Sequence, residues 1–163
     1  MSIYTFGVYV DELEDVVREI EIKGTQTFNE LHQAIAKSFK LNLKMQASFF
    51  VSNSRWQKLN EITLGHSSVF ENAFNGMKDS IESVLPEKGK HLVYFNEDAA
   101  DYTILILLEK VTDKENPSKT YPAIVTAKGS FSGSGQSFFV SDFGINEGDL
   151  DIEGMEIGEA PKE

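Results

Sequence analysis

The sequence predicts an α+β fold with a mixed β-sheet, because one segment of helical periodicity stands among several segments that alternate between apolar and polar residues. Residues 3–10 and 16–22 alternate in this way on either side of a polar stretch of hairpin length, so they predict an N-terminal β-hairpin. Residues 28–40 then carry apolar side chains at helical spacing. A hairpin, a helix and a strand in this order are the opening of a β-grasp-like sheet.

The N-terminal hairpin shows this alternation most clearly, and a single arginine stands within its apolar face. That face consists of Tyr4, Phe6, Val8 and Val10 on the first strand and of Val16, Arg18, Ile20 and Ile22 on the second. Successive side chains of a strand point to opposite sides of a sheet. We expect the helix that follows to pack on the hairpin.

The predicted helix has a clear start. Thr27 and Glu30 stand three residues apart, as in a capping box, where the hydroxyl and the carboxylate bind backbone N–H groups that have no partner at a helix start. We expect one long amphipathic helix over residues 28–40. Its apolar stripe consists of Phe28, Leu31, Ala34, Ile35 and Phe39.

The rest of the body contains apolar runs of strand length at residues 48–52, 91–95, 102–111 and 121–127. Residues 104–108 are the most apolar of these, which predicts a central strand covered on both faces. Pro122 has no N–H to donate to a neighbouring strand, so the last run is predicted at a sheet edge. Residues 53–66 are expected to form a loop, and short helices to begin near Ser68 and Asp79.

The charge is distributed unevenly along the chain. The formal net charge is −11; residues 1–128 hold 14 basic and 18 acidic side chains, whereas residues 129–163 hold one lysine against 8 acids. We predict a single α+β domain at residues 1–128, followed by a Gly/Ser linker and an acidic C-terminal arm at residues 129–163. Because apolar residues are interleaved with its acids, the arm suits docking on a groove or a sheet edge.

The composition argues against several classes of protein. A chain with this excess of acids is repelled by phosphate backbones, which disfavours general nucleic-acid binding. The absence of cysteine excludes disulfides, thiolate metal sites and a cysteine nucleophile. No apolar run approaches the roughly 20 residues that span a bilayer, and no signal peptide is visible. We therefore expect a cytoplasmic protein that does not bind membranes.

A stretch without acidic residues, between Glu30 and Glu61, contains the best candidate for an exposed contact surface. Its positive charges are Lys37, Lys40, Lys44, Arg55 and Lys58. Arg55 adjoins Trp56, and an indole beside a cation suits stacking on a base or anchoring a protein interface. The candidate surface consists of Arg55, Trp56, Lys44 and Lys58. The alternative is that Trp56 belongs to the core and that the cations are ordinary solvated side chains.

No pattern typical of a catalytic site or a metal site occurs in the sequence, so we predict no catalytic residue, no metal and no cofactor. The histidines His32, His66 and His91 show no His-x-x-x-His spacing. The weak candidates for metal ligands are His32, Asp98 and Asp101. The alternative for His32 is a packed helix residue that is hydrogen-bonded to a backbone group.

The order and spacing of several short motifs resemble those of a known family. The motifs are Tyr4-x-Phe6-x-Val8, Arg18-x-Ile20, Thr27-Phe28-x-x-Leu31-His32-x-x-Ile35-x-x-x-Phe39, Leu85-x-x-x-Gly89 and Leu92-x-Tyr94. They resemble the Ri-plasmid (pRiA-type) open-reading-frame-three-like domain family, sometimes labelled a transposon passenger protein, and the acidic tail is similar to Bacteroidetes forms. Between Tyr94 and Tyr102 the chain lacks the glycine and tryptophan of many members. The resemblance implies an α+β fold and a cytoplasmic bacterial protein, and it brings no established activity.

The sequence supports three hypotheses about function. The first is a non-catalytic protein-interaction module, whose partner is another protein or its own acidic arm packed against residues 31–60. The second is a nucleic-acid-associated accessory protein of a mobile element, which would use the candidate contact surface. The third is a metal-dependent enzyme that uses His32 and the acids near Asp98.

Overall fold

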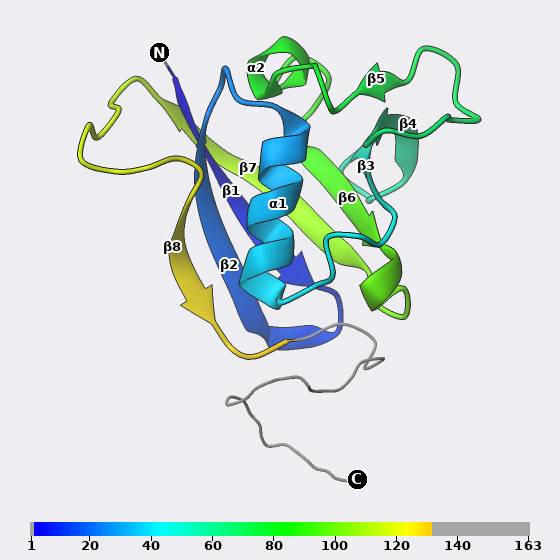
Figure 1. Cartoon of the computed structure of the whole chain (residues 1–163), viewed down its shortest axis with the longest axis horizontal. Helices are drawn as coiled ribbons and strands as arrows, with labels where there is room; N and C mark the ends of the chain where they lie inside the picture. Colours follow the sequence, from blue (N-terminus) through cyan, green and yellow to red (C-terminus); the bar gives the residue numbers. More distant parts are fainter. Residues whose placement is uncertain (1, 132–163) are drawn as a thin grey trace, which may run out of the picture.

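A mixed sheet of eight strands dominates residues 2–131, which are the residues that the computed structural model describes (Figure 1). The strands are β1 (Ile3–Val10), β2 (Leu13–Lys23), β3 (Ala47–Ser52), β4 (Lys58–Thr63), β5 (Phe74–Asn75), β6 (His91–Asn96), β7 (Ile104–Thr112) and β8 (Ala123–Lys128). Their order across the sheet is β5-β4-β3-β6-β7-β1-β2-β8. Neighbouring strands are antiparallel except for β4 and β5. The α+β class is thus confirmed.

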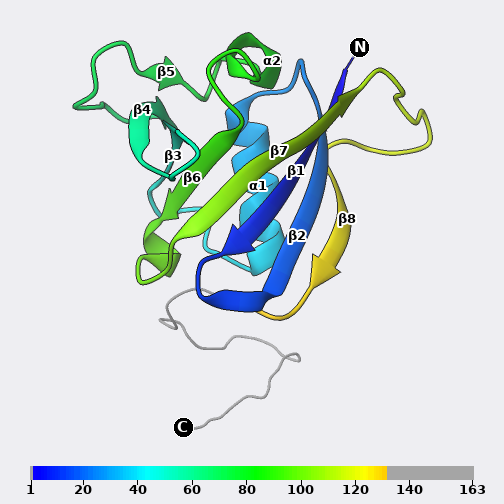
Figure 2. The same cartoon turned by 180° about the vertical axis from the view of Figure 1, so that it is seen from behind.

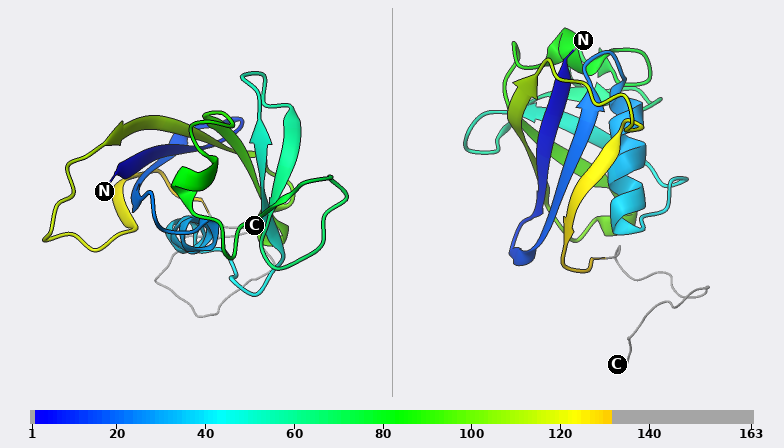
Figure 3. Two further views of the ribbon diagram at one scale, coloured as in Figure 1. Left: turned by 90° about the horizontal axis from the view of Figure 1, so that it is seen from above. Right: turned by 90° about the vertical axis from the view of Figure 1, so that its left-hand side faces the viewer.

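The helices lie on one side of this sheet, and the sheet curls around the longest of them (Figure 3). They are α1 (Phe28–Phe39), α2 (Ile81–Val84) and the 3-10 helix η1 (Glu97–Ala99). The core lies between α1 and the sheet, and its fully buried side chains include Phe6, Ile20, Ile22, Phe28, Leu31, Ile35, Phe39 and Phe49. None of the helices in residues 2–131 has the length and apolar composition needed to cross a membrane.

The predicted N-terminal hairpin is confirmed by the pairing of β1 with β2. Tyr4 pairs with Ile22 and Val8 pairs with Arg18, so the predicted apolar face, with its arginine, is the one that packs under α1. Glu12 closes the turn in the left-handed region, with a φ of 72°.

The predicted capping box is also present. The Glu30 N–H donates to the Thr27 hydroxyl at 3.3 Å, and the Thr27 N–H donates to the Glu30 carboxylate at 3.0 Å. The helix ends one residue earlier than expected, because Lys40 adopts a left-handed conformation with a φ of 57° and its N–H binds the carbonyls of the last turn. With 12 residues, α1 has an average length, and the prediction of one long helix is not confirmed.

Several details differ from the sequence-based expectations. The β-grasp-like order is not confirmed, because β6 and β7, which come later in the chain, separate β3 from the hairpin. Residues 53–66 are not one loop, since they contain β4. No helix begins near Ser68, whereas the expected second short helix is α2. The predicted edge strand is β8, which ends the sheet beyond β2.

The two faces of the sheet are covered differently. Viewed from behind, β6, β7, β1 and β2 lie in front of α1, and no helix of the described residues covers them on this side (Figure 2). The prediction that the apolar run in β7 is covered on both faces is therefore wrong for residues 2–131. Ile104, Ile106 and Leu108 face α1 and are buried, whereas Leu105 and Leu107 on the opposite side are only half-buried.

Candidate functional site

Five apolar side chains form a continuous row across the helix-free face. Phe50 pairs with Val93 across β3 and β6, and Val93 pairs with Leu105 across β6 and β7. Leu105 in turn pairs with Tyr9, which pairs with Val17 across β1 and β2. Directly paired residues point to the same side of a sheet. These five residues, here called the outer row, span four strand spacings, or about 19 Å.

The outer row exists because the apolar runs of these strands supply side chains to both faces. Phe49, Tyr94 and Ile106, each next to a residue of the row, point toward α1 and are at most 1% exposed. In the row itself, Val93 is 6% exposed and the other four side chains are half-buried. In an antiparallel sheet with one solvated face, the outward positions are usually polar. The outer row is therefore the feature of this face that calls for a functional explanation.

The β3–β4 hairpin forms a rim at one end of the outer row. The Asn53 side-chain oxygen accepts hydrogen bonds from the N–H groups of Arg55 at 2.9 Å and Gln57 at 3.0 Å, which fixes the turn. Trp56 takes up a left-handed conformation with a φ of 64°, which costs a residue with a side chain about 1–2 kcal/mol. Its half-buried ring meets the His91 ring edge-on, 4.8 Å between centroids. Trp56 is thus held against the outer face and does not enter the core below α1.

Of the four residues predicted as a contact surface, the structure gathers three on this rim. The Lys58 ammonium lies 4.3 Å from the centre of the Phe50 ring, so it adjoins the end of the outer row. Arg55 is exposed at the tip of the same hairpin as Trp56. Lys44 precedes β3, whereas Arg55 follows it, so Lys44 lies at the opposite end of that strand and does not belong to the cluster.

Beside the row, the Glu61 carboxylate ties residues 66–68 to the sheet. It accepts hydrogen bonds from the Ser48 and Ser68 hydroxyls and contacts Nε2 of His66 at 2.9 Å. Burial by itself raises the pKa of Glu61, but the three hydrogen-bond partners outweigh it and hold this pKa below its usual value. Both hydroxyls donate to the carboxylate, so the two serines and His66 surround Glu61. The sequence carries no signal for this cluster, because Glu61 lies within residues 53–66, which are expected to form a loop.

The comparisons with known proteins agree with this architecture. The model of the family described as plasmid pRiA4b ORF-3-like protein matches residues 2–133, which is most of the chain. The chain belongs to this family. The resemblance of the tail to Bacteroidetes forms of the family stays a prediction.

The chain is also similar to a solved structure. No curated protein matches the chain. A similar solved structure is the crystal structure of a protein of unknown function, MM3350, from Methanosarcina mazei Go1. It has a TM-score of 0.67 and 16% sequence identity, and the alignment covers 80% of this chain and 72% of that chain. At this identity the likeness shows the fold alone.

In this member of the pRiA4b ORF-3-like family, His32 belongs to the core. Its Nδ1 lies 2.7 Å from the Tyr94 hydroxyl, which also accepts a hydrogen bond from the Asn96 side chain at 3.0 Å. His32 thus binds a side chain and not the backbone group that we expected. Burial lowers the pKa of His32 and raises that of Tyr94, so both groups stay neutral near pH 7. The network stabilises the core and exposes no reactive group.

The other metal-ligand candidates of this family member lie apart. The Asp98 carboxylate accepts a hydrogen bond from the Asn42 N–H at 3.0 Å, and Asp101 is exposed in the following turn. Within residues 2–131, no three histidine, aspartate or glutamate side chains are close enough together to hold a metal ion. His32 and Trp56 lie on opposite faces, since Tyr94 and His91, their respective partners on β6, are an odd number of residues apart.

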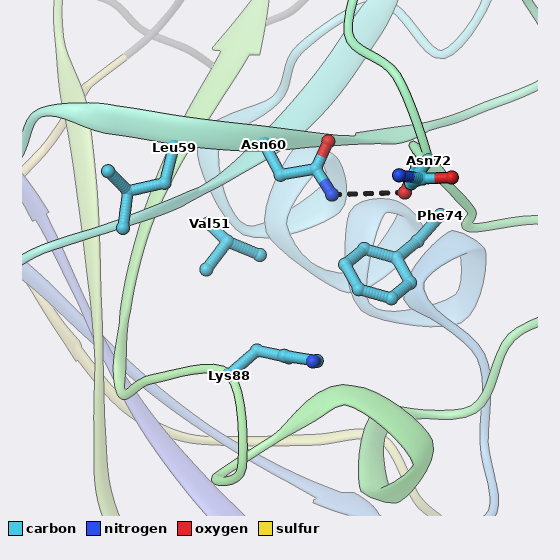
Figure 4. A pocket seen from close by; sticks show the side chains of 6 residues that line it. All are labelled: Val51, Leu59, Asn60, Asn72, Phe74 and Lys88. Atoms are coloured by element: carbon cyan, nitrogen blue, oxygen red, sulfur yellow. Dashed lines mark hydrogen bonds between the residues drawn. The ribbon is translucent and has the colours of Figure 1, made fainter.

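A hollow of about 360 Å³ also opens beside β4 and β5 in this family member (Figure 4). It is lined by Val51, Leu59, Asn60, Asn72, Phe74 and Lys88. The Asn60 side chain donates a hydrogen bond to the Asn72 carbonyl at 3.0 Å and closes one wall, and Lys88 lies on the other side of the hollow. This volume is at the lower end of the range for small-molecule sites.

Proposed function

We propose that this protein is a non-catalytic protein-interaction module that binds its partner through the outer row. The observation that carries this proposal is the position of the row, on a sheet face that no helix of residues 2–131 covers. A row of apolar side chains on a sheet face without a covering helix is typical of interaction sites. Burial of these side chains against a partner removes apolar surface from water at about 25 cal/mol per Å².

The polar groups around the row indicate the chemistry of the partner. Lys58 and Arg55 place positive charge at the Phe50 end. At the other end, Glu109 accepts a hydrogen bond from the Tyr9 hydroxyl at 2.6 Å, which is the main reason that the pKa of Tyr9 rises to about 12. The best complement is a protein segment with aliphatic or aromatic side chains and an acidic group at the end that meets Lys58.

Site-specific photo-cross-linking tests this proposal. A photoreactive residue in place of Leu105 is expected to capture one dominant protein in the native cell, and the added substitution Phe50→Asp is expected to abolish the capture. Val69 is the matched control position, since it is 97% exposed and lies outside the row. Identical products from positions 105 and 69 would contradict the proposal.

A second candidate function is that of a nucleic-acid-associated accessory protein, and the β3–β4 rim favours it. Trp56, Lys58 and Arg55 combine an aromatic ring with two cations, which suits single strands that stack their bases on aromatic side chains. The test is a salt titration of binding to single-stranded and duplex DNA. We expect the paired substitution of Arg55 and Lys58 by alanine to lower the salt slope by about 1.4, at about 0.7 for each lost phosphate contact, while Lys44→Ala leaves it unchanged. Absence of salt-dependent binding at about 50 mM salt would eliminate this candidate.

A further inference from the structure

We infer that residues 137–141 of this chain add to the free edge of β8 as a further strand and cover the groove between β8 and α1. This inference concerns the edge of the sheet and is independent of the outer row.

The first observation is the open edge of β8. This strand pairs with β2 through Glu21, Ile20, Glu19, Arg18 and Val17, and within residues 2–131 no strand pairs with its other side. Ile124 and Val125 on this edge are 38% and 40% exposed. An open edge with exposed β-branched residues is a template for the pairing of another strand.

The second observation is a groove along this edge. β8 lies beside α1 (Figure 3), and a hollow of about 310 Å³ between them is lined by Glu30, Gln33, Ala34, Lys37, Pro122 and Ile124. Ile124 pairs with the inward-facing Ile20, so its side chain points toward α1. A peptide that extends a sheet gains affinity from main-chain hydrogen bonds and specificity from pockets for alternate side chains. The edge of β8 and the groove supply both elements.

The third observation identifies the occupant. Residues 137–141 have the sequence Ser-Phe-Phe-Val-Ser, which is identical to that of residues 48–52. Residues 48–52 lie within β3, which pairs with β4 on one side and β6 on the other. The same five residues thus form a central strand elsewhere in this chain, and their aromatic and β-branched side chains suit strands in general. In a strand, either Phe139 or both Phe138 and Val140 would face the groove.

The point at which the described chain ends makes this pairing feasible. Arg18 donates hydrogen bonds to the carbonyls of Lys128 at 2.7 Å and Gly129 at 2.9 Å, and Phe131 packs edge-on against Phe39 and Tyr102. The chain is therefore held within three residues of the end of β8. The six steps from residue 131 to residue 137 span up to about 20 Å, enough to return to Lys128 and run antiparallel to β8.

The tether favours this segment over a second copy of the chain. A short flexible linker gives a tethered segment an effective concentration in the millimolar range. Residues 132–136 are Ser-Gly-Ser-Gly-Gln, a composition typical of such a linker. In this arrangement the start of the arm lies against α1, which consists of residues 28–39. This helix overlaps residues 31–60, against which the arm is expected to pack.

Amide hydrogen exchange on the full chain tests the inference. Amides of β8 that do not bond to β2 are expected to exchange at least ten times more slowly in the wild type than in Val140→Pro, because proline removes an N–H and breaks the added strand. Ile152→Pro, in the acidic arm beyond this segment, is the matched control and is expected to leave exchange unchanged. Equal exchange in the wild type and Val140→Pro would overturn the inference.

A cross-linking experiment supplies a second test. The chain has no cysteine, so a disulfide can form only between introduced residues. Thr126→Cys is combined in turn with Phe138→Cys, Phe139→Cys and Val140→Cys, and one pair is expected to form an intramolecular disulfide, whereas Thr126→Cys with Ile157→Cys is not. Failure of all three pairs would overturn the inference. So would disulfide-linked dimers that disappear on dilution, because the occupant would then be a second copy.

Discussion

Replacement of Arg18 by methionine is expected to be among the most destabilising single changes in the described part of this protein. Arg18 is 5% exposed, and its guanidinium donates hydrogen bonds to carbonyl groups in three places: Val17 on β2, Ser38 at the end of α1, and Lys128 and Gly129 at the end of β8. It therefore joins the hairpin, the helix and the final strand. Burial lowers the pKa of Arg18, which reflects the cost of removing the charge from water.

The magnitude follows from these contacts. Three of the four hydrogen bonds are short, at 2.7 to 2.9 Å, and the fourth is 3.3 Å long. A hydrogen bond to a charged group contributes about 1.5–3 kcal/mol, and the lower value is appropriate because desolvation of the guanidinium offsets part of the gain. Methionine keeps an apolar side chain but makes none of these bonds, and it loses the contact of the guanidinium with the Phe39 ring, 4.9 Å from the centroid. At about 1.5 kcal/mol for each of the three short bonds, we expect a loss of about 4–5 kcal/mol in the free energy of unfolding.

Urea unfolding measures this loss. With a slope of about 2 kcal/mol per M, the midpoint of Arg18→Met is expected to fall by about 2 M. Arg18→Lys keeps the charge but has fewer N–H donors, so its midpoint is expected to lie between those of the wild type and Arg18→Met. Arg55→Met is the matched control, since Arg55 is exposed and is expected to shift the midpoint by less than about 0.3 M. A shift for Arg18→Met as small as that of the control would refute the reasoning.

Three further predictions concern single side chains. Thr27→Ala removes the N-cap hydroxyl of α1 and is expected to lower stability by about 1 kcal/mol in urea unfolding, with the exposed Thr25→Ala as its control. Tyr94→Phe leaves His32 and Asn96 without their shared hydroxyl and is expected to cost about 1–3 kcal/mol; an unchanged midpoint would show that the network contributes nothing. Glu61 has a lowered folded-state pKa, so its stabilising contribution is present above the unfolded value of about 4.3 and is lost as the pH falls through the folded value. In thermal unfolding between about pH 7 and about pH 3, the melting temperature of Glu61→Gln is expected to fall less with decreasing pH than that of the wild type.

The parts of the fold that were predictable depend on neighbours in sequence. The capping box of Thr27 and Glu30 and the apolar stripe of α1 involve residues within one or two helical turns. The β1–β2 hairpin is closed by a short turn, so its pairing is also local. By contrast, β4 contains Asn60 and Glu61, which look like loop residues until Ser48 and Ser68 are seen to bind the glutamate.

The candidate site could be predicted only in part, for the same reason. Arg55, Trp56 and Lys58 are close in sequence and share a hairpin. The outer row is different, because it depends on β6 and β7 lying between β3 and β1, and no single strand shows which strand will be its neighbour. Charge alone groups Lys44 with Arg55, but the length of β3 separates them.

The neighbour of β1 in the sheet has a consequence for synthesis of the protein. β1 is made well before β7, which covers its other edge and begins at residue 104. At about 5–20 residues per second, a ribosome needs roughly 5–20 s to make the intervening hundred or so residues. During that interval the backbone N–H and C=O groups on this edge of β1 have no strand to pair with. Chaperones that hold emerging chains are therefore expected to engage residues 3–23 before β7 has been made.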